Sequence, residues 1–269
     1  MLFSKHFVYN NVPSLQFGLF FGHIDTERFK RLCGEFKYNT QYYNSQNKNV
    51  IYDIDKDDSA LSFDVEIISE TPIVHLQARQ IKKWLFNNSE YHKLYSDRTE
   101  DRTFEIVNGE EKRLYVECIF SNPEELRYAD GLHGWKCTCQ LSSGFAFQDK
   151  IERTYTDFSS DITVKVDSDY DDYLYPVLVI DVDENSNPTD VTIINKSDNN
   201  RIMKLQDVTM GTKIYADCAD CIITDDSNIS LYDKLSERKF LRLVNGDNVL
   251  SISGASKLNI SWQNLRWLR

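Results

Sequence analysis

Hydrophobic and polar positions alternate over many short segments of this chain. Within residues 134–147, every second side chain from Trp135 to Leu141 is apolar, and the positions between are polar. Strict alternation is typical of a strand that buries one face. The same spacing predicts further strands at Leu61–Ile67, Leu114–Cys118, Ile162–Val166, Val191–Ile193 and Leu258–Trp262, and YPVLVIDV from Tyr175 predicts a more fully apolar strand.

One segment has a clear helical pattern. Thr71 is a suitable N-cap, and Pro72 suits the first helical position. Asn87-Asn88 supplies a stop. The sequence therefore predicts a helix over 72–87 that packs on a sheet. The apolar stripe expected to face that sheet comprises Ile73, Val74, Leu76, Ala78, Ile81, Trp84 and Leu85.

Turn signals and one composition shift predict the domain organisation. The polar run at 149–160 predicts a boundary between domains 1–149 and 150–269. Short strands at regular spacing predict a β-sandwich for the second domain. The chain is therefore expected to be mainly β, with two domains and its one helix in the first. Turns are expected at Asn108-Gly109, Asn187-Pro188 and Asn245-Gly246-Asp247.

The net charge of the chain narrows the classes of partner that it can bind. The 269-residue chain has a formal net charge of −11, which disfavours nucleic-acid binding because that relies on Lys and Arg at phosphates. No run of about 18 apolar residues predicts a membrane span. The first residues lack a secretory pattern. We therefore expect assembly in a cytoplasm, with the six cysteines reduced.

Two cysteine pairs are candidates for metal or redox chemistry. Cys137-x-Cys139 lies in the alternating run, where a packing role is the competing interpretation. Cys218-x-x-Cys221 has the spacing of a zinc or redox pair. A zinc site needs further ligands, and a thioredoxin-like site needs a βαβ context. Neither is predicted, so structural roles are favoured for both pairs.

Three acidic runs are candidates for cation binding. Asp53-x-Asp55-x-Asp57 and Asp181-x-Asp183-x-Asn185-x-Asn187 resemble the start of calcium loops. Both lack the glycine and the glutamate that complete such loops, so solvated turns are favoured. The run from Asp167 to Tyr173 is interpreted as an exposed loop, with a cation-binding rim as the alternative.

Motifs for catalysis are missing from the sequence. There is no G-x-S-x-G, no phosphate-binding glycine loop and no H-E-x-x-H. The histidines at 6, 23, 75, 92 and 133 form no spaced cluster, and Trp135, Trp262 and Trp267 are expected to pack in cores or at edges. We therefore predict no enzyme activity and no catalytic, cofactor-binding or metal-binding residues. A carboxylate pair for glycoside hydrolysis stays open as a third possibility.

The order of motifs along the chain resembles a known family. The helix ending in Trp84-Leu85 precedes the strand with Cys139 and Phe145-Ala146-Phe147, and the second half contains GTKIYADC and then Leu243 with residues 245–252. This order is similar to that of the distal tail protein (Dit) family of long-tailed bacteriophages, the siphovirus tail component family. The resemblance covers nearly the whole chain. Ser143-Gly144 departs from the Ser-Pro usual in the family.

The resemblance implies a structural virion protein without a cofactor. Its first domain would form a hexameric ring that continues the tail tube. Its second would be a galectin-like β-sandwich, with residues 264–269 returning to the first domain as in some relatives. Implied partners are the tail tube protein, the tail-tip protein and the tape-measure or receptor-binding proteins, with no specific nucleic acid and no membrane. Such a baseplate hub joins tube to host-adhesion device and lets DNA pass at ejection. The alternative is a saccharide-binding adhesin of the virion or cell surface.

Overall fold

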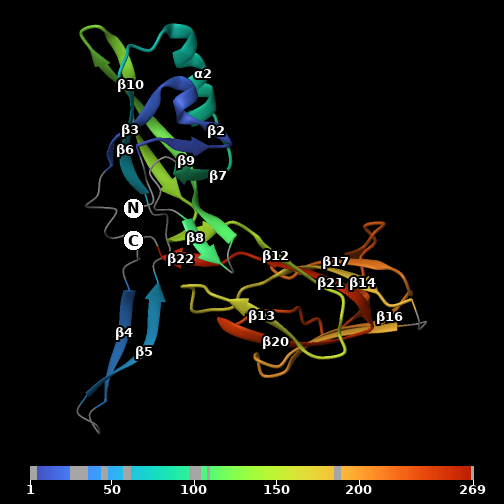
Figure 1. Cartoon of the computed structure of the whole chain (residues 1–269). Coiled ribbons are helices and arrows are strands. Elements are labelled where there is room, and N and C mark those ends of the chain that lie inside the picture. The colour runs from blue at the N-terminus through green and yellow to red at the C-terminus, as the bar shows by residue number, and fades with distance from the viewer. Residues whose placement is uncertain are drawn as a thin grey trace. The chain divides into compact units, whose positions relative to one another are not determined.

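The computed structural model describes residues 5–24, 36–43, 48–56, 62–96, 104–107, 110–184 and 189–267. The chain forms two compact units (Figure 1). Unit 1 comprises Met1–Phe147 with Trp267–Arg269, and unit 2 comprises Gln148–Arg266. The described residues are mainly β, as predicted, with a single α-helix among them. That helix is too short to span a membrane.

Unit 1 is built on one large antiparallel sheet. Its strands follow the order β2-β1-β7-β9-β10-β6-β3, with β8, β11 and β22 attached to this path. The strands are β1 (Phe7–Tyr9), β2 (Val12–Pro13), β3 (Leu19–Ile24), β6 (Ser62–Ser69), β7 (His92–Ser96), β8 (Phe104–Val107), β9 (Glu110–Tyr128), β10 (Gly131–Leu141), β11 (Phe145–Gln148) and β22 (Leu265–Trp267).

The predicted alternating strand is β10, near the middle of this sheet. Its four alternating apolar side chains are all buried, and the polar side chains between them are not. Gly134 lies opposite Ile68 of β6, and a Cβ at Gly134 would contact the carbonyl oxygen of Ile67 and come within 2.8 Å of the Ile68 Cα. The sheet therefore needs glycine at this position. The buried alternating residues are Trp135, Cys137, Cys139 and Leu141.

Helix α2 (His75–Phe86) covers this sheet but begins later than predicted. The N-cap position is Val74, not Thr71, and no side chain caps the helix. The backbone N–H of Ile73 donates to the carbonyl of Leu132 in β10 at 2.7 Å. This bond holds residue 73 against the sheet, and Val74 has extended backbone dihedrals, so the helix begins only at His75. The sequence alone does not reveal a tertiary bond of this kind.

The buried face of α2 is narrower than the predicted stripe. Ala78, Ile81 and Leu85 are buried, whereas Val74 and Leu76 are 65% and 69% exposed. The prediction that these two contact the sheet was therefore wrong. Val74 precedes the helix, and Leu76 lies about 180° around the helix from Leu85 at roughly 100° per residue.

Strands β4 (Phe36–Tyr43) and β5 (Lys48–Lys56) form a separate two-stranded sheet that the sequence analysis missed. Asp53 and Asp55 lie within β5, opposite Asn39 and Lys37. They are in a strand and not in the expected solvated turn. Val50, Ile51, Tyr52 and Ile54 supply the β propensity that outweighs the acidic pattern.

Unit 2 contains two five-stranded antiparallel sheets, which lie one over the other in Figure 1. One has the order β12-β21-β14-β17-β18, and the other has the order β13-β20-β15-β16-β19. The strands are β12 (Ile151–Tyr155), β13 (Ile162–Val166), β14 (Val177–Val182), β15 (Thr189–Asn195), β16 (Arg201–Val208), β17 (Lys213–Asp217), β18 (Ile222–Asp225), β19 (Leu235–Ser236), β20 (Gly246–Ser253) and β21 (Ala255–Trp262).

The apolar positions predicted for these strands are buried. Ile162, Val164 and Val166 alternate with exposed residues in β13, and Leu258, Ile260 and Trp262 are buried in β21. Strand β14 alternates between buried and half-buried positions, so it is less fully enclosed than predicted. Residues 108–109 and 187–188, two of the expected turns, lie outside the described residues.

The turn expected at residues 245–247 was wrong in its extent: Asn245 forms a bend, but Gly246 and Asp247 begin β20 and pair with β13. A buried polar network lies beside this segment. Asn248 is fully buried, and its amide both accepts from the backbone N–H of Val244 and donates to that residue's carbonyl. Asn195 donates to the Asn248 side chain at 2.9 Å. Nearby in the sequence, Arg242 forms a two-point ion pair with buried Asp198. These partners satisfy polar groups that would otherwise be costly to bury.

The acidic run from Asp167 is partly structural. The buried hydroxyl of Ser168 accepts from the backbone N–H of Leu265 at 3.1 Å and donates to its carbonyl at 3.2 Å. Asp167 pairs with Arg266 at 2.9 Å. The expectation of a merely exposed loop was therefore incomplete, because this run fixes residues 265 and 266, the part of β22 that belongs to unit 2.

Candidate functional site

The thiols of Cys137 and Cys139 lie in the apolar core of unit 1. Both side chains are buried on the same face of β10. Burial raises the pKa of each thiol above its ordinary value, and a hydrogen bond with Cys118 further raises that of Cys139. A raised pKa disfavours the thiolate that metal binding and redox chemistry need. The arrangement supports the predicted packing role.

Cys218 and Cys221 lie in unit 2, in different environments. Cys218 is buried, and burial raises its pKa to about 12. Cys221 is exposed, with a positive φ of 56°. The two cysteine pairs fall in separate units. Within the described parts of the chain, no group of three or more His, Cys, Asp or Glu side chains is placed to hold a metal ion.

The second calcium-like run begins inside a strand. Asp181 lies in β14, opposite Lys213 of β17, and the two form an ion pair at 3.8 Å. Asn185 and Asn187 lie outside the described residues, as does Asp57 of the first run. Of the tryptophans discussed above, Trp135 and Trp262 are buried as predicted, and Trp267 contacts the ring of Phe145 at 4.5 Å.

A groove lies beside α2 in unit 1. It has a volume of about 600 Å³ and is lined by α2 and by the ends of β9 and β10. Its apolar floor contains Ile73, Ala78 and Leu132. Its charged and polar lining comprises His75, Arg79, Lys82, Glu125 and Arg127.

The charges in this groove are mostly positive. Glu125 accepts from Lys82 at 2.7 Å and from Arg127 at 2.8 Å, and these bonds lower the pKa of its carboxyl group. Arg79 has no ion-pair or hydrogen-bond partner among the described residues. One carboxylate thus faces three permanent cations, on a chain whose net charge is −11.

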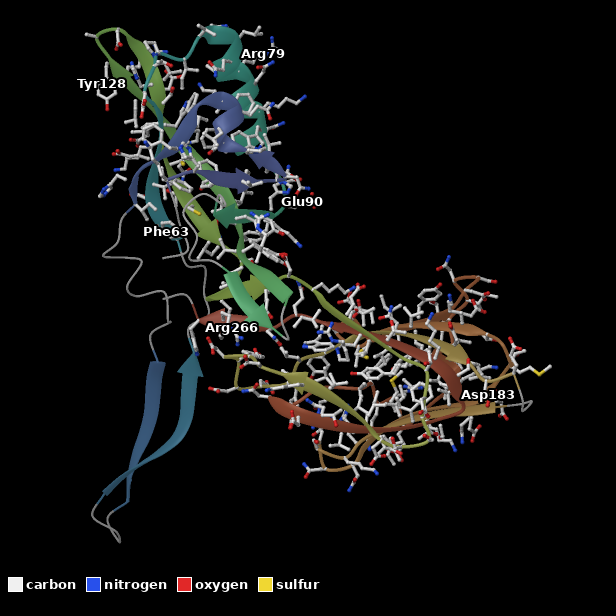
Figure 2. All side chains as sticks on the ribbon, in the orientation of Figure 1. Phe63, Arg79, Glu90, Tyr128, Asp183 and Arg266 are labelled. Atoms are coloured by element: carbon white, nitrogen blue, oxygen red, sulfur yellow. The ribbon has the colours of Figure 1, made fainter. Side chains whose placement is uncertain are left out.

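Exposed apolar side chains lie at the same end of unit 1. Val74 and Leu76 flank the start of α2, and Tyr128, at the end of β9, is 62% exposed. Figure 2 shows Arg79 and Tyr128 at this end. Clustered exposed apolar side chains beside unpaired charge are typical of interaction surfaces. From the sequence, Val74 and Leu76 were expected to belong to the stripe of the helix that packs on the sheet, so this surface was not predicted.

The β10 end of this surface is fixed by His133. Its Nδ1 lies 3.1 Å from the carbonyl oxygen of Ser69, and its Nε2 lies 2.9 Å from Asp130 Oδ1. Two acceptors favour the form with both ring nitrogens protonated, so the bonds to Ser69 and Asp130 raise the pKa of His133. The imidazole therefore ties the β9–β10 turn to the end of β6.

Family models match almost the whole chain. Residues 3–143 match a model described as the phage tail protein N-terminal domain, and residues 144–262 match one described as the phage tail C-terminal domain. The chain therefore belongs to this family of phage tail proteins. A search of curated protein sequences finds no significant match.

Solved structures of two phages share the fold. The chain is similar to the SPP1 Dit (gp 19.1) protein, with a TM-score of 0.67 and 8% identity over 97% of this chain and 98% of that one. That structure is described as a paradigm of the hub adsorption apparatus in phages that infect Gram-positive bacteria. Chains of the phage P2 baseplate in its activated conformation, with Ca and with Sr, match at a TM-score of 0.54. They are 9% and 8% identical, and each match covers 96% of this chain and 97% of the other.

These findings confirm the predicted resemblance. The two-domain, mainly β fold is that of a distal tail protein, and the family is one of structural phage tail proteins. Such a protein is a component of the virion tail.

Proposed function

We propose that this chain is a baseplate-hub protein whose unit 1 closes into a hexameric ring. The ring joins the tail tube to the tail-tip and host-adhesion proteins, and unit 2 is a galectin-like sandwich. Assembly takes place in the host cytoplasm. The observation that carries the proposal is the match of fold, over nearly the full length of both chains, to a hub protein of another phage.

The sheet of unit 1 supports a ring on physical grounds. Its path ends at β2 and β3, and each of these pairs with one neighbour only among the described strands. Open strand edges favour uncontrolled pairing unless they are covered. Head-to-tail contacts between identical subunits cover such edges, and they form a closed ring when the rotation between subunits closes.

The ring is tested by measuring mass and shape. The purified chain, alone and co-expressed with the tail tube protein of the same phage, is analysed by size-exclusion chromatography with light scattering and by negative-stain microscopy. We expect a particle of six times the 31.5 kDa chain mass, with a central hole. A monomer in both preparations would contradict the proposal.

Passage of DNA is the second part of the proposed function. A chain with a net charge of −11 repels phosphates at long range, so DNA can move through a ring of six such chains without adhering. The map of the assembled ring tests this idea directly. A channel lined by Lys and Arg would contradict it.

Saccharide binding by unit 2 is a second candidate function, and one observation favours it. Tyr215 and Ile222 are 42% and 54% exposed, and both lie on the outward face of paired strands β17 and β18, since Ile214, Ala216 and Ile223 point inward. An aromatic ring on an open sheet face can stack on a sugar. Binding to host-wall glycans on an array, lost in Tyr215→Ala, would support this role. No binding by the wild-type chain would dismiss it.

A further inference from the structure

The groove beside α2 has features of a docking site for a protein segment. Beside the groove, Leu76 and Val74, which are not among its lining residues, offer apolar contact area that unit 1 itself leaves uncovered. Arg79 offers a charge without a partner among the described residues. A segment that fits this surface would present an apolar side chain next to a carboxylate.

The chain itself carries such a segment just after the same helix. Glu90 and Tyr91 follow the end of α2, and both are exposed, Tyr91 by 43%. Neither has a hydrogen-bond or ion-pair partner among the described residues. Figure 2 shows Arg79 and Glu90 toward opposite ends of α2 in unit 1. A basic–apolar surface and an acidic–apolar surface thus lie at different places on one unit.

We propose that Glu90 and Tyr91 of one copy dock in the α2 groove of the next copy, with Glu90 facing Arg79 and Tyr91 against Leu76. The contact joins two different surfaces of identical subunits, which is the kind of contact that closes rings. It rests on the proposed ring function and names the residues that would hold subunits together.

The charge balance favours a second copy as the occupant. The groove has three permanent cations against one carboxylate, and a second copy has an overall charge of −11. Approach of another copy is therefore attractive at the groove, although it is repulsive over most of the surface. Attraction between exposed charges is screened by salt, so the contact should weaken as ionic strength rises.

Charge-swap variants test the contact. Arg79→Glu and Glu90→Arg are each expected to weaken self-association at least tenfold, measured by sedimentation equilibrium in low salt. The double variant Arg79→Glu/Glu90→Arg restores the opposite charges across every contact and is expected to recover most of it. Leu76→Ser removes an exposed apolar side chain, so it should weaken assembly without lowering the melting temperature.

Lys165→Glu is the matched control. It makes the same charge change, but Lys165 is an exposed residue of β13 in unit 2 and lies outside the proposed contact. Association unchanged by Arg79→Glu, or weakened equally by Lys165→Glu, would overturn the docking contact and leave the ring proposal standing. A wild-type chain that stays monomeric, alone and with the tail tube protein, would overturn both.

Discussion

Trp84 joins α2 to the N-terminal strands of unit 1. Its indole N–H donates to the carbonyl of Tyr9 at 2.9 Å, and its ring lies 5.3 Å from that of Phe17 and 6.1 Å from that of Phe7. The side chain is half-buried, so it contributes both a hydrogen bond and aromatic contacts.

Two substitutions of Trp84 should destabilise unit 1 to different extents, because one removes only the hydrogen bond and the other also removes the ring. Trp84→Phe keeps a ring but leaves the Tyr9 carbonyl without its donor, at a cost of about 1 kcal/mol. Trp84→Ala also loses the ring contacts, at a cost of about 3 kcal/mol. Urea unfolding followed by circular dichroism measures both. Equal stability of Trp84→Ala and wild type would contradict this placement.

His133 makes the stability of unit 1 depend on pH. Its pKa is raised in the folded state above the ordinary value of about 6.5. A raised folded pKa gives stability that is complete below the unfolded pKa and is lost as pH rises through the folded pKa. We therefore expect the melting temperature of unit 1 to fall as pH rises above about 6.5.

Two substitutions isolate this effect. His133→Gln should flatten the pH dependence, since glutamine does not titrate. His75→Gln, at an exposed histidine of the groove, should leave it unchanged. Melting temperatures measured between about pH 5.5 and about pH 8.5 would show the difference between the two variants. A wild-type melting temperature that does not change over this range would refute the role of His133.

At the scale of elements, the close pairing of β6 with β10 depends on Gly134. A methyl group there would press on the backbone of Ile67 and Ile68, which has no freedom to move within the sheet. Gly134→Ala is therefore expected to destabilise unit 1 by about 3 kcal/mol.

Lys136→Ala is the control for this substitution. It lies on the same strand, but its side chain points away from the core. We expect a change of less than about 0.5 kcal/mol. Denaturant unfolding of the two variants compares them, and a Gly134→Ala protein as stable as wild type would show that the two strands can separate at little cost.

Sequence patterns predicted which helices and strands exist better than they predicted where those elements end or what they pack against. Alternation located β10 and the strands of unit 2, because a period of two is visible in the residues themselves. The predicted start of α2 was wrong, because the observed start depends on a hydrogen bond from Ile73 to Leu132, almost sixty residues away. The exposure of Leu76 was missed because an apolar residue suits a core and a protein interface equally well.

The candidate site depends on proximity that the chain order hides. Lys82 and Arg127 are distant in sequence, yet both bind Glu125. The β4–β5 hairpin was missed for a related reason: its acidic residues resemble a cation loop, and only strand pairing shows otherwise. The family resemblance was carried instead by motif order, which survives when individual residues change.

At the scale of the whole molecule, the net charge of −11 predicts weak interaction with DNA. We expect no binding to a labelled duplex below about 100 μM at physiological salt, measured by fluorescence anisotropy. The same measurement in low salt is the control, since any residual attraction through the α2 groove would appear there first. Micromolar binding at physiological salt would contradict the proposed passage of DNA without adhesion.

The strand order of unit 2 has a consequence for synthesis. Strand β21 lies between β12 and β14, which are made about 80 to 100 residues earlier on the ribosome. Until translation has passed Trp262, both earlier strands lack the neighbour that completes their sheet. Unit 2 therefore folds late in synthesis, and a product interrupted before Ala255 keeps open edges that mark it for aggregation or proteolysis.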